Sequence, residues 1–247
     1  MKWPGPLIEA VFLQRYKRFL ADFRLADGRV VTAHCANTGS MATCMEPNAP
    51  SRLTFHDDPK RKLQYSWQTV LLSDGWVGIN TSIANGLVKE GVTAGVIGEL
   101  SGYDSIAAEQ RYGEGSRIDL LLKGAGRRDC YVEVKNVTLL LEAGVAGFPD
   151  AVTQRGAKHL DALCGVIAKG CRAVLLYCVQ RESARKIMPA EGYDPHYART
   201  LRQAAKKGLE IYAYRADFQD TGIRLATRLP VYAGAVGQGA GPSKTVN

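Results

Sequence analysis

Short apolar runs separated by turn residues fill positions 7–80. The runs are LIEAVFL (7–13), FLADFRL (19–25), RVVTAHC (29–35), WQTVLLS (67–73) and WVGINT (76–81). An Ala-Asp-Gly turn separates the second run from the third, and Asp74-Gly75, a pair typical of tight hairpins, separates the last two. No long helical periodicity interrupts these runs. Several short strands in so short a segment predict a small barrel, and the five-stranded oligonucleotide-binding (OB) barrel is the natural candidate.

The pattern changes near residue 83. The segments 83–91 (IANGLVKEG) and 103–113 (YDSIAAEQRYG) suggest helices, and two apolar strand runs follow, 116–122 and 130–139, separated by a turn rich in Gly and Arg. A helix is then expected over 150–169, with Asp150 as its N-cap and its apolar stripe on one face. The stripe consists of Leu160, Leu163, Cys164 and Ile167.

The last third alternates strand and helix patterns. A buried strand is expected at 172–179, a helix from Asp194-Pro195 through Lys207, ended by Gly208, and a strand at 209–214. This order predicts a mixed α/β sheet with helices on its faces. We therefore expect a barrel over 1–81, an α/β domain over 82–232, and a disordered tail over 233–247, which is rich in glycine.

Composition narrows the class of protein. The net charge of +8 suggests an anionic partner such as nucleic acid. The six cysteines have no CxxC or CxxxC spacing beside a histidine, which argues against zinc ribbons and favours reduced thiols. No apolar run is long enough to span a membrane, and the start MKWPGPLIEA lacks the layout of a secretory signal, so we expect a cytoplasmic protein.

Asp119 and the pair Glu133 and Lys135 carry the candidate chemistry. Glu133 and Lys135 are two residues apart on a predicted strand and therefore share a face, and a hairpin would bring Asp119 beside them. Two carboxylates and the backbone carbonyl of Val134 suit Mg²⁺ or Mn²⁺, while Lys135 could orient water or offset charge during phosphodiester hydrolysis. A surface salt-bridge ladder across a hairpin is the alternative interpretation.

Other residues have weaker assignments. Glu109, expected near a helix end, is a candidate third carboxylate; Glu114 is an alternative, and an ordinary exposed glutamate is the plain interpretation of both. The candidate nucleic-acid contacts are Arg61, Lys62, Tyr65, Trp67, Arg117, Arg155, Lys158 and His159. Trp67 could instead belong to the core, and the helical face of Arg155, Lys158 and His159 could simply be solvated. The polar stretch 37–40 is a plain turn or a phosphate contact.

Six long segments carry a resemblance to a known family: AHCANTGSM (33–41), RKLQYSW (61–67), GEGSRIDLLL (113–122), CYVEVKNVTL (130–139), FPDAVTQRGAKHLDAL (148–163) and RAVLLYCVQR (172–181). In these the chain resembles the sugar fermentation stimulation protein A family. The resemblance implies an OB-like barrel followed by a PD-(D/E)XK nuclease-like domain, and nonspecific DNA binding with a regulatory role in maltose metabolism. It also implies that Asp119, Glu133 and Lys135 are the active-site triad, with Glu109 as a helix carboxylate. Gln110 departs from the small apolar residue usual after that glutamate.

Three functions remain open at this point. The first is a metal-dependent nuclease acting on DNA or also RNA. The second is a DNA-binding regulator of sugar-utilisation genes that does not cut and needs no metal. The third is a carbohydrate-binding protein, which the basic charge disfavours. The sequence leaves open whether the chain forms a homodimer, and no recognition helix of the helix-turn-helix type is apparent.

Overall fold

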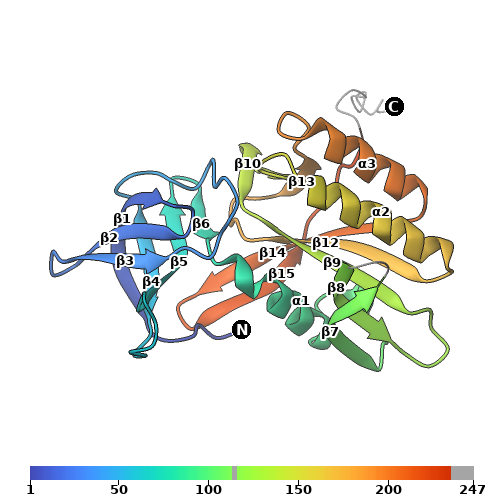
Figure 1. Cartoon of the computed structure of the whole chain (residues 1–247), viewed down its shortest axis with the longest axis horizontal. Helices are drawn as coiled ribbons and strands as arrows, with labels where there is room; N and C mark the ends of the chain where they lie inside the picture. Colours follow the sequence, from blue (N-terminus) through green and yellow to red (C-terminus); the bar gives the residue numbers. More distant parts are fainter. Residues whose placement is uncertain (113–115, 235–247) are drawn as a thin grey trace, which may run out of the picture.

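The structure is a computed structural model and describes residues 1–112 and 116–234. The predicted tail from residue 235 onward and the alternative carboxylate Glu114 lie outside the described residues. Two parts stand side by side, a β-barrel and an α/β part (Figure 1). No helix in the described segments is both long and apolar enough to cross a membrane.

The barrel closes through its third and fifth strands. Its strands pair in the order β3-β2-β1-β4-β5-β6, and a further parallel pairing of β3 with β5 closes five of them into a ring. This confirms the expected OB barrel, although strand β4 was not predicted. The strands are β1 (Leu7–Tyr16), β2 (Leu20–Leu25), β3 (Val30–His34), β4 (Pro50–Phe55), β5 (Tyr65–Leu72) and β6 (Gly75–Gly78).

Aromatic packing fills the barrel. The ring of Trp67 stacks on Phe12 at 4.9 Å between centroids and meets Phe23 edge-on at 5.1 Å. Buried residues alternate with more exposed ones along β2, and the sequence's short apolar runs close on a single core. The barrel is therefore a preformed scaffold for the loops at its ends.

The α/β part has a central mixed sheet of order β15-β14-β12-β9-β8-β7. Helices α2 and α3 cover one face and α1 the other, each burying its apolar stripe against the sheet (Figure 1). The sheet strands are β7 (Ser105–Tyr112), β8 (Ser116–Lys123), β9 (Cys130–Val137), β12 (Arg172–Val179), β14 (Glu210–Gln219) and β15 (Gly222–Arg228). The helices are α1 (Ala84–Thr93), α2 (Gln154–Ala168) and α3 (Pro195–Lys206), with short 3-10 turns η1 (Thr81–Ile83) and η2 (Gly98–Leu100).

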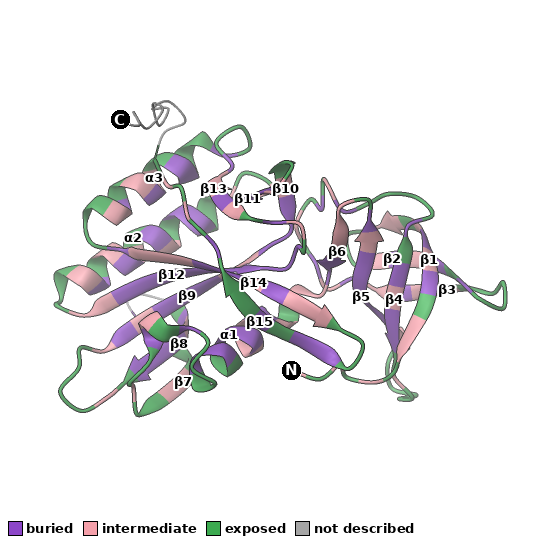
Figure 2. Ribbon diagram, turned by 180° about the vertical axis from the view of Figure 1, so that it is seen from behind, coloured by how far each residue is buried: buried purple, intermediate pink, exposed green. Residues whose placement is uncertain are grey.

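The parallel pair β9 and β12 is the most deeply covered part of this sheet, as Figure 2 shows. Strands enclosed on both faces are apolar almost throughout, which makes the charged positions of β9 conspicuous. A smaller sheet beside it contains β10 (Leu139–Glu142), β11 (Val145–Phe148) and β13 (Lys186–Pro189).

Two local predictions were wrong. The segment expected to be helical at 103–113 contains strand β7, because its backbone pairs antiparallel with β8 along the sheet edge and this pairing overrides the helix propensity of its Ala, Glu and Gln residues. Asp150 does not cap α2. Thr153 does so by accepting a hydrogen bond from Gly156 N, while the Asp150 carboxylate bonds Ser40 Oγ and Met41 N in the barrel part. Asp194 caps the start of α3 as predicted, and the helix ends just before Gly208, whose φ is 99°.

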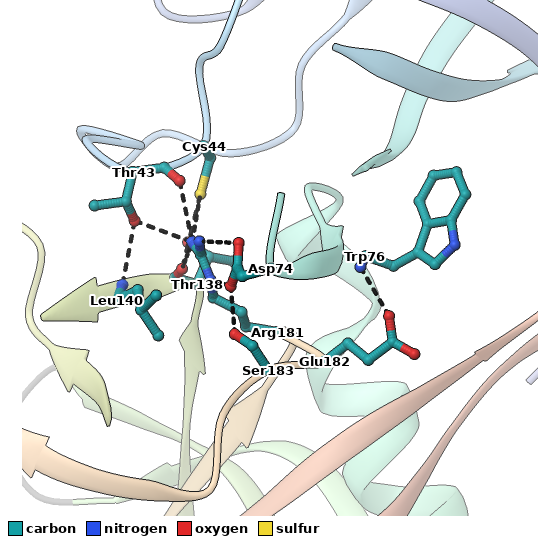
Figure 3. A network of polar contacts seen from close by, with 9 residues as sticks. All are labelled: Thr43, Cys44, Asp74, Trp76, Thr138, Leu140, Arg181, Glu182 and Ser183. Carbon is teal, nitrogen blue, oxygen red and sulfur yellow. Dashed lines mark hydrogen bonds and ion pairs between the residues drawn. The ribbon is translucent and has the colours of Figure 1, made fainter. Parts of the chain in front are cut away.

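A buried guanidinium joins the two parts. Arg181, which is 3% exposed, follows β12 and donates two hydrogen bonds to the carboxylate of Asp74, in the β5–β6 turn, at 2.8 and 2.7 Å (Figure 3). It also donates to the carbonyls of Thr43 and Thr138. At the chain's start, the amino group of Met1 bonds Glu90 and the carbonyl of Ile223, which ties residues before β1 to the α/β part.

Candidate functional site

A cavity of about 820 Å³ lies where α2, the β7–β9 strands and two barrel-side segments meet. We call it the carboxylate cavity. Residues from strands, a helix and loops far apart in sequence line it: Thr38, Thr81, Glu109, Arg117, Asp119, Glu133, Val134, Lys135, Arg155, Lys158 and His159. The structure thus brings the predicted carboxylates, the lysine and the predicted cations of the α/β part to one place.

The ladder between β8 and β9 stops at the cavity. The backbone pair at this end of the ladder is Leu120 with Val132, and one step further the carboxylate of Asp119 takes the place of a backbone acceptor, accepting from Val134 N at 2.7 Å. In a β-strand the N–H and C=O of one residue point to the same side. The carbonyl of Val134 therefore faces the same gap as Asp119, as the sequence hypothesis requires.

Glu133 lies on the face of β9 that α2 covers and is only 2% exposed. Its Oε1 accepts from Lys135 Nζ at 2.7 Å and contacts His159 Nδ1. Its Oε2 is buried and has no hydrogen-bond partner among the described residues. A buried carboxylate oxygen without a partner is costly, so this atom marks a position for a ligand that the protein itself does not supply.

The two carboxylates differ electrostatically. Burial alone would raise the pKa of Glu133, but the hydrogen bond from His159 and the charge of Lys135 hold that pKa below its ordinary value. Burial and the charge of Glu133 raise the pKa of Asp119, although hydrogen bonds from Val134 N and Asn85 partly offset this. The side chains around Glu133 thus favour its ionised form more than those around Asp119 do, and a cation between the two would stabilise both charges.

His159 is oriented by its neighbours on either side. Arg155 Nε donates to His159 Nε2 at 3.3 Å, so Nε2 is the accepting nitrogen and the ring hydrogen lies on Nδ1, facing Glu133. Lys135 Nζ stands 3.5 Å from the same Nδ1, and two donors cannot bond each other. His159 therefore serves Glu133 as a hydrogen-bond donor from α2.

Glu109 reaches the cavity from a strand rather than from the predicted helix. It lies in β7, between the pairs Ala108 with Leu120 and Gln110 with Ile118, and is absent from the regular ladder. Its backbone has φ of 53°, a left-handed conformation that costs a residue with a side chain. The exposed side chain of Glu109 lines the cavity together with Asp119, as the sequence hypothesis requires. The expected helix is wrong, because Glu109 belongs to strand β7.

Three residues near the site, Asn85, Thr81 and Tyr112, were missed by the sequence reasoning, whereas Thr38 belongs to the stretch 37–40 already considered as a phosphate contact. Asn85 of α1 donates to Asp119 Oδ1 at 2.9 Å, and Thr38 and Thr81 form the barrel-side wall of the cavity. Tyr112 buries a hydroxyl with no partner among the described residues; burial and the charges of Glu133 and Asp119 raise its pKa. No local pattern distinguishes these residues from ordinary helix, turn or strand residues, because only tertiary packing brings them to the site.

The predicted nucleic-acid contacts of the barrel lie elsewhere. The prediction that Trp67 stacks on a base is wrong, because its side chain is fully buried in the barrel core. Its Nε1 donates to Thr69 O. Tyr65 is half-buried, with its ring 5.2 Å from that of Phe55. Arg61 and Lys62 are exposed on the loop before β5. None of these four lines the carboxylate cavity as the described residues define it.

The polar stretch 37–40 is a structured turn that faces the α/β part. Asn37 is 4% exposed and its side chain accepts from Gly39 N at 2.8 Å, while Arg15 donates to the carbonyls of Asn37 and Gly39. Ser40 Oγ donates to Asp150 O at 2.8 Å. The turn therefore positions Thr38 at the carboxylate cavity.

Comparison with known proteins places the chain in context. A family described as "Sugar fermentation stimulation protein RE domain" matches residues 82–222, and one described as "SfsA N-terminal OB domain" matches residues 13–79. A "Sugar fermentation stimulation protein homolog" of Geobacter sulfurreducens is 52% identical over 231 residues, which cover 94% of this chain and 98% of that protein. Its counterpart in Maricaulis maris is 52% identical over 223 residues, covering 90% and 95%.

A solved structure shares the whole fold. It is described as "The structure of Pyrococcus Furiosus SfsA in complex with Ca2+" and superposes with a TM-score of 0.84 at 27% identity, covering 94% of this chain and 98% of that one. The relation therefore extends through both parts of the chain.

Proposed function

The chain belongs to the sugar fermentation stimulation protein family, and on that premise we propose that it is a nucleic-acid-binding nuclease that hydrolyses phosphodiester bonds with a divalent cation in the carboxylate cavity. One observation carries the proposal. The buried Glu133 Oε2 has no partner among the described residues, and it lies in a cavity that Asp119 and the cationic side chains of Arg117, Lys135, Arg155 and Lys158 also line. Such an oxygen suits a hard cation, and the surrounding positive charge suits a phosphate.

The donor set fits a cation that prefers oxygen ligands and retains waters. Glu133 Oε2, the Asp119 carboxylate and the Val134 carbonyl would hold Mg²⁺ or Mn²⁺, with Glu109 within reach of the same cavity. When bound, the cation would polarise the scissile phosphate and lower the pKa of a water ligand. The Pyrococcus furiosus relative in complex with Ca²⁺ supports a divalent cation at this fold, since Ca²⁺ also takes oxygen ligands.

The chain's own cations have separate tasks in this proposal. Lys135, which is hydrogen-bonded to Glu133, would orient the attacking water or offset charge that develops on the phosphate. His159 would hold the Glu133 carboxylate in its orientation. Arg117, Arg155 and Lys158 line the same cavity and would bind phosphates that flank the scissile bond.

A second function is favoured by a different observation. No group of three or more His, Cys, Asp or Glu side chains among the described residues is already spaced to hold a metal ion. The Asp119 carboxylate already accepts hydrogen bonds from Asn85 and Val134 N. Glu133 Oε1 accepts from Lys135 and His159. A protein that binds DNA as a regulator of maltose metabolism and does not cut would keep these hydrogen bonds without any metal.

One assay separates the two functions. Purified protein is incubated with labelled single- and double-stranded DNA and RNA in Mg²⁺, Mn²⁺, Ca²⁺ or EDTA, beside the variants Glu133→Gln and Glu142→Gln. Glu142 is an exposed residue of β10 outside the cavity, so its variant controls for loss of one negative charge. We expect metal-dependent cleavage that Glu133→Gln lowers at least about a hundredfold and Glu142→Gln does not change.

Binding is measured separately from cutting. In EDTA the affinity of Glu133→Gln for DNA should stay level or rise slightly, because a negative charge near the phosphates is removed. Calorimetric titration with Mg²⁺ should show weaker binding by Glu133→Gln. If the parent binds DNA but cuts with no metal, the regulator function replaces the nuclease; if Glu133→Gln cuts like the parent, the assignment of the site is wrong.

A further inference from the structure

A second polar hollow lies in the barrel, at the seam where β3 pairs with β5. We call it the barrel pocket. Its volume is about 330 Å³, ample for a hydrated anion, and its polar lining consists chiefly of His34, His56, Arg61, Ser66, Asn80 and Ser82. It is separate from the carboxylate cavity, and the proposed nuclease chemistry uses none of these six residues.

Nitrogen groups converge on one hydroxyl in this pocket. His34 is the ladder partner of Ser66 in the parallel pairing of β3 with β5. His56 Nε2 stands 3.1 Å from Ser66 Oγ, and Arg61 Nη2 donates to the same oxygen at 3.3 Å. Two side chains from the loop after β4 thus meet the edge of β5 at a single point, although they are five residues apart in the sequence.

A chain of hydrogen bonds holds the floor of the pocket. Gln68, which is 1% exposed, donates through Nε2 to Thr54 Oγ1 at 2.8 Å, and its Oε1 accepts from Asn80 Nδ2 at 3.0 Å. Asn80 Oδ1 in turn accepts from the backbone and hydroxyl of Ser82 at 3.1 and 2.6 Å. These side chains are locked before any ligand arrives, which lowers the entropic cost of binding.

The chemistry of the pocket selects an anion. None of its lining residues, as far as the structure describes the chain, is acidic. Arginine and histidine together with hydroxyl and amide donors are the groups that bind phosphate oxygens. Burial, followed by the charge of Arg61, lowers the pKa of His56, and an anion beside both side chains would favour the protonated imidazole.

The barrel pocket and the carboxylate cavity share a wall. Ala36, Asn80 and Ser82 line the pocket, whereas Thr38 and Thr81 line the cavity. Thr81 Oγ1 donates to Ala36 O at 2.9 Å and joins the two segments of the wall. Residues one or two positions apart have Cα atoms within about 8 Å, so the linings of the two hollows are adjacent at residues 36–38 and 80–82.

We propose that the barrel pocket is a phosphate-binding subsite, and that it holds a phosphate group of a nucleic-acid strand a few nucleotides away from the bond in the carboxylate cavity. The phosphate chemistry follows from the pocket itself. The assignment to a nucleic-acid strand rests on the proposed function. The barrel would then set how far along the strand the cavity acts, which gives it a positioning role beyond general affinity.

Histidine NMR tests the pocket directly, because the chain has four histidines in different surroundings. His34 and His56 report on the pocket, His159 on the carboxylate cavity, and His196, exposed on α3, is the control. Inorganic phosphate is titrated into the full chain at fixed pH and ionic strength in EDTA, with resonances assigned by single His→Gln variants. We expect saturable shifts of His34 and His56 that His196 does not follow.

Two matched variants measure the contribution of the guanidinium. Arg61→Gln should weaken phosphate binding by about fivefold to tenfold, since it removes a charge-assisted donor from the pocket. Arg24→Gln loses the same charge from an exposed position of β2 outside the pocket and should leave the affinity unchanged. Both substitutions are at exposed positions, and equal melting temperatures verify that neither variant is unfolded.

Single-stranded oligonucleotides with and without a 5′-phosphate identify the source of the phosphate. Displacement of inorganic phosphate by both assigns the pocket to a backbone phosphate, and displacement by the 5′-phosphorylated strand alone assigns it to a strand end. Displacement by neither overturns the assignment to nucleic acid. Shifts of His34 and His56 no larger than that of His196, or equal effects of the two arginine variants, overturn the subsite itself. The readout needs neither metal nor cleavage, so a protein that never cuts would refute the proposed nuclease without touching this result.

Discussion

At the scale of single residues, neighbouring aromatic side chains on β5 have different environments. Trp67 is fully buried between Phe12 and Phe23, whereas Tyr65 is half-buried at the strand's start, beside Phe55. A buried indole stabilises the barrel through its packing area, and only a ring with an accessible face can stack on a base. The two residues should therefore affect different measurements.

Trp67→Ala should lower the free energy of unfolding by about 3–5 kcal/mol, because it leaves a cavity in the barrel core. Trp67→Phe should lower it less and leave the affinity for single-stranded DNA unchanged. Tyr65→Ala should cost about 1–3 kcal/mol of DNA-binding free energy if the ring stacks on a base. Urea unfolding and fluorescence anisotropy measure the two effects. If the Trp67→Phe variant is folded but binds DNA more weakly, Trp67 contributes to DNA binding and the purely structural role is wrong.

At the scale of elements, β7 carries a local irregularity next to the cavity. Glu109 adopts φ of 53° in the middle of a strand whose neighbours pair regularly with β8. Strained backbone of this kind is found at functional sites, where the surrounding structure enforces it. The irregularity takes Glu109 out of the regular ladder and coincides with its side chain lining the carboxylate cavity.

Glycine substitutions test whether this conformation is strained. Glu109→Gly should leave the free energy of unfolding nearly unchanged, because relief of left-handed strain of about 1–2 kcal/mol offsets the extra entropy of glycine. Gln110→Gly, at the next position of the same strand, should destabilise by about 0.5–1 kcal/mol. Urea unfolding of both variants gives the comparison. Equal losses at the two positions would show that the conformation of Glu109 stores no strain.

At the scale of the whole molecule, Arg181 holds the barrel against the α/β part. Its guanidinium reaches Asp74 in the β5–β6 turn and the carbonyls of Thr43 and Thr138, and Ser183 also bonds Asp74 (Figure 3). Thr43 belongs to the same connecting segment as Thr38, which forms part of the cavity wall. Coupling between the two parts should therefore influence both stability and the geometry of the site.

Arg181→Met should destabilise the chain by about 3–5 kcal/mol, because it leaves the carboxylate of Asp74 partly buried without its partner. Arg185→Met is the matched control: Arg185 is exposed and its guanidinium donates to the nearby carbonyls of Glu182 and Ala184, so we expect less than about 1 kcal/mol. Chemical unfolding followed by both tryptophan fluorescence and circular dichroism measures the change. Equal effects of the two variants would contradict a coupling role for Arg181.

The same ion pair predicts a pH dependence. Burial raises the pKa of Asp74, but hydrogen bonds from Arg181 and Ser183 and the arginine charge lower it more, so the folded value lies below the ordinary one. A carboxylate whose pKa is lowered in the folded state contributes its full stabilisation above the unfolded pKa of about 4. This contribution is lost as the pH falls through the folded pKa. Asp74→Asn should therefore flatten the loss of stability below about pH 4 relative to the parent. If the free energy of unfolding of Asp74→Asn falls below about pH 4 as steeply as that of the parent, other carboxylates cause the loss.

The sequence alone determined the features that depend on spacing along one element. The alternation of β9 puts Glu133 and Lys135 on one face, the short apolar runs predict the barrel, and Asp194 and Gly208 delimit α3, because strand period, capping and glycine conformation are local properties. Only the tertiary structure decided what depends on partners distant in sequence. It made β7 a strand, moved Asp150 from a helix cap to the barrel contact, buried Trp67, and brought Thr38, Thr81 and Asn85 to the carboxylates. These outcomes follow from strand pairing and packing between parts, whose energies outweigh local preference and leave no mark on the neighbouring sequence.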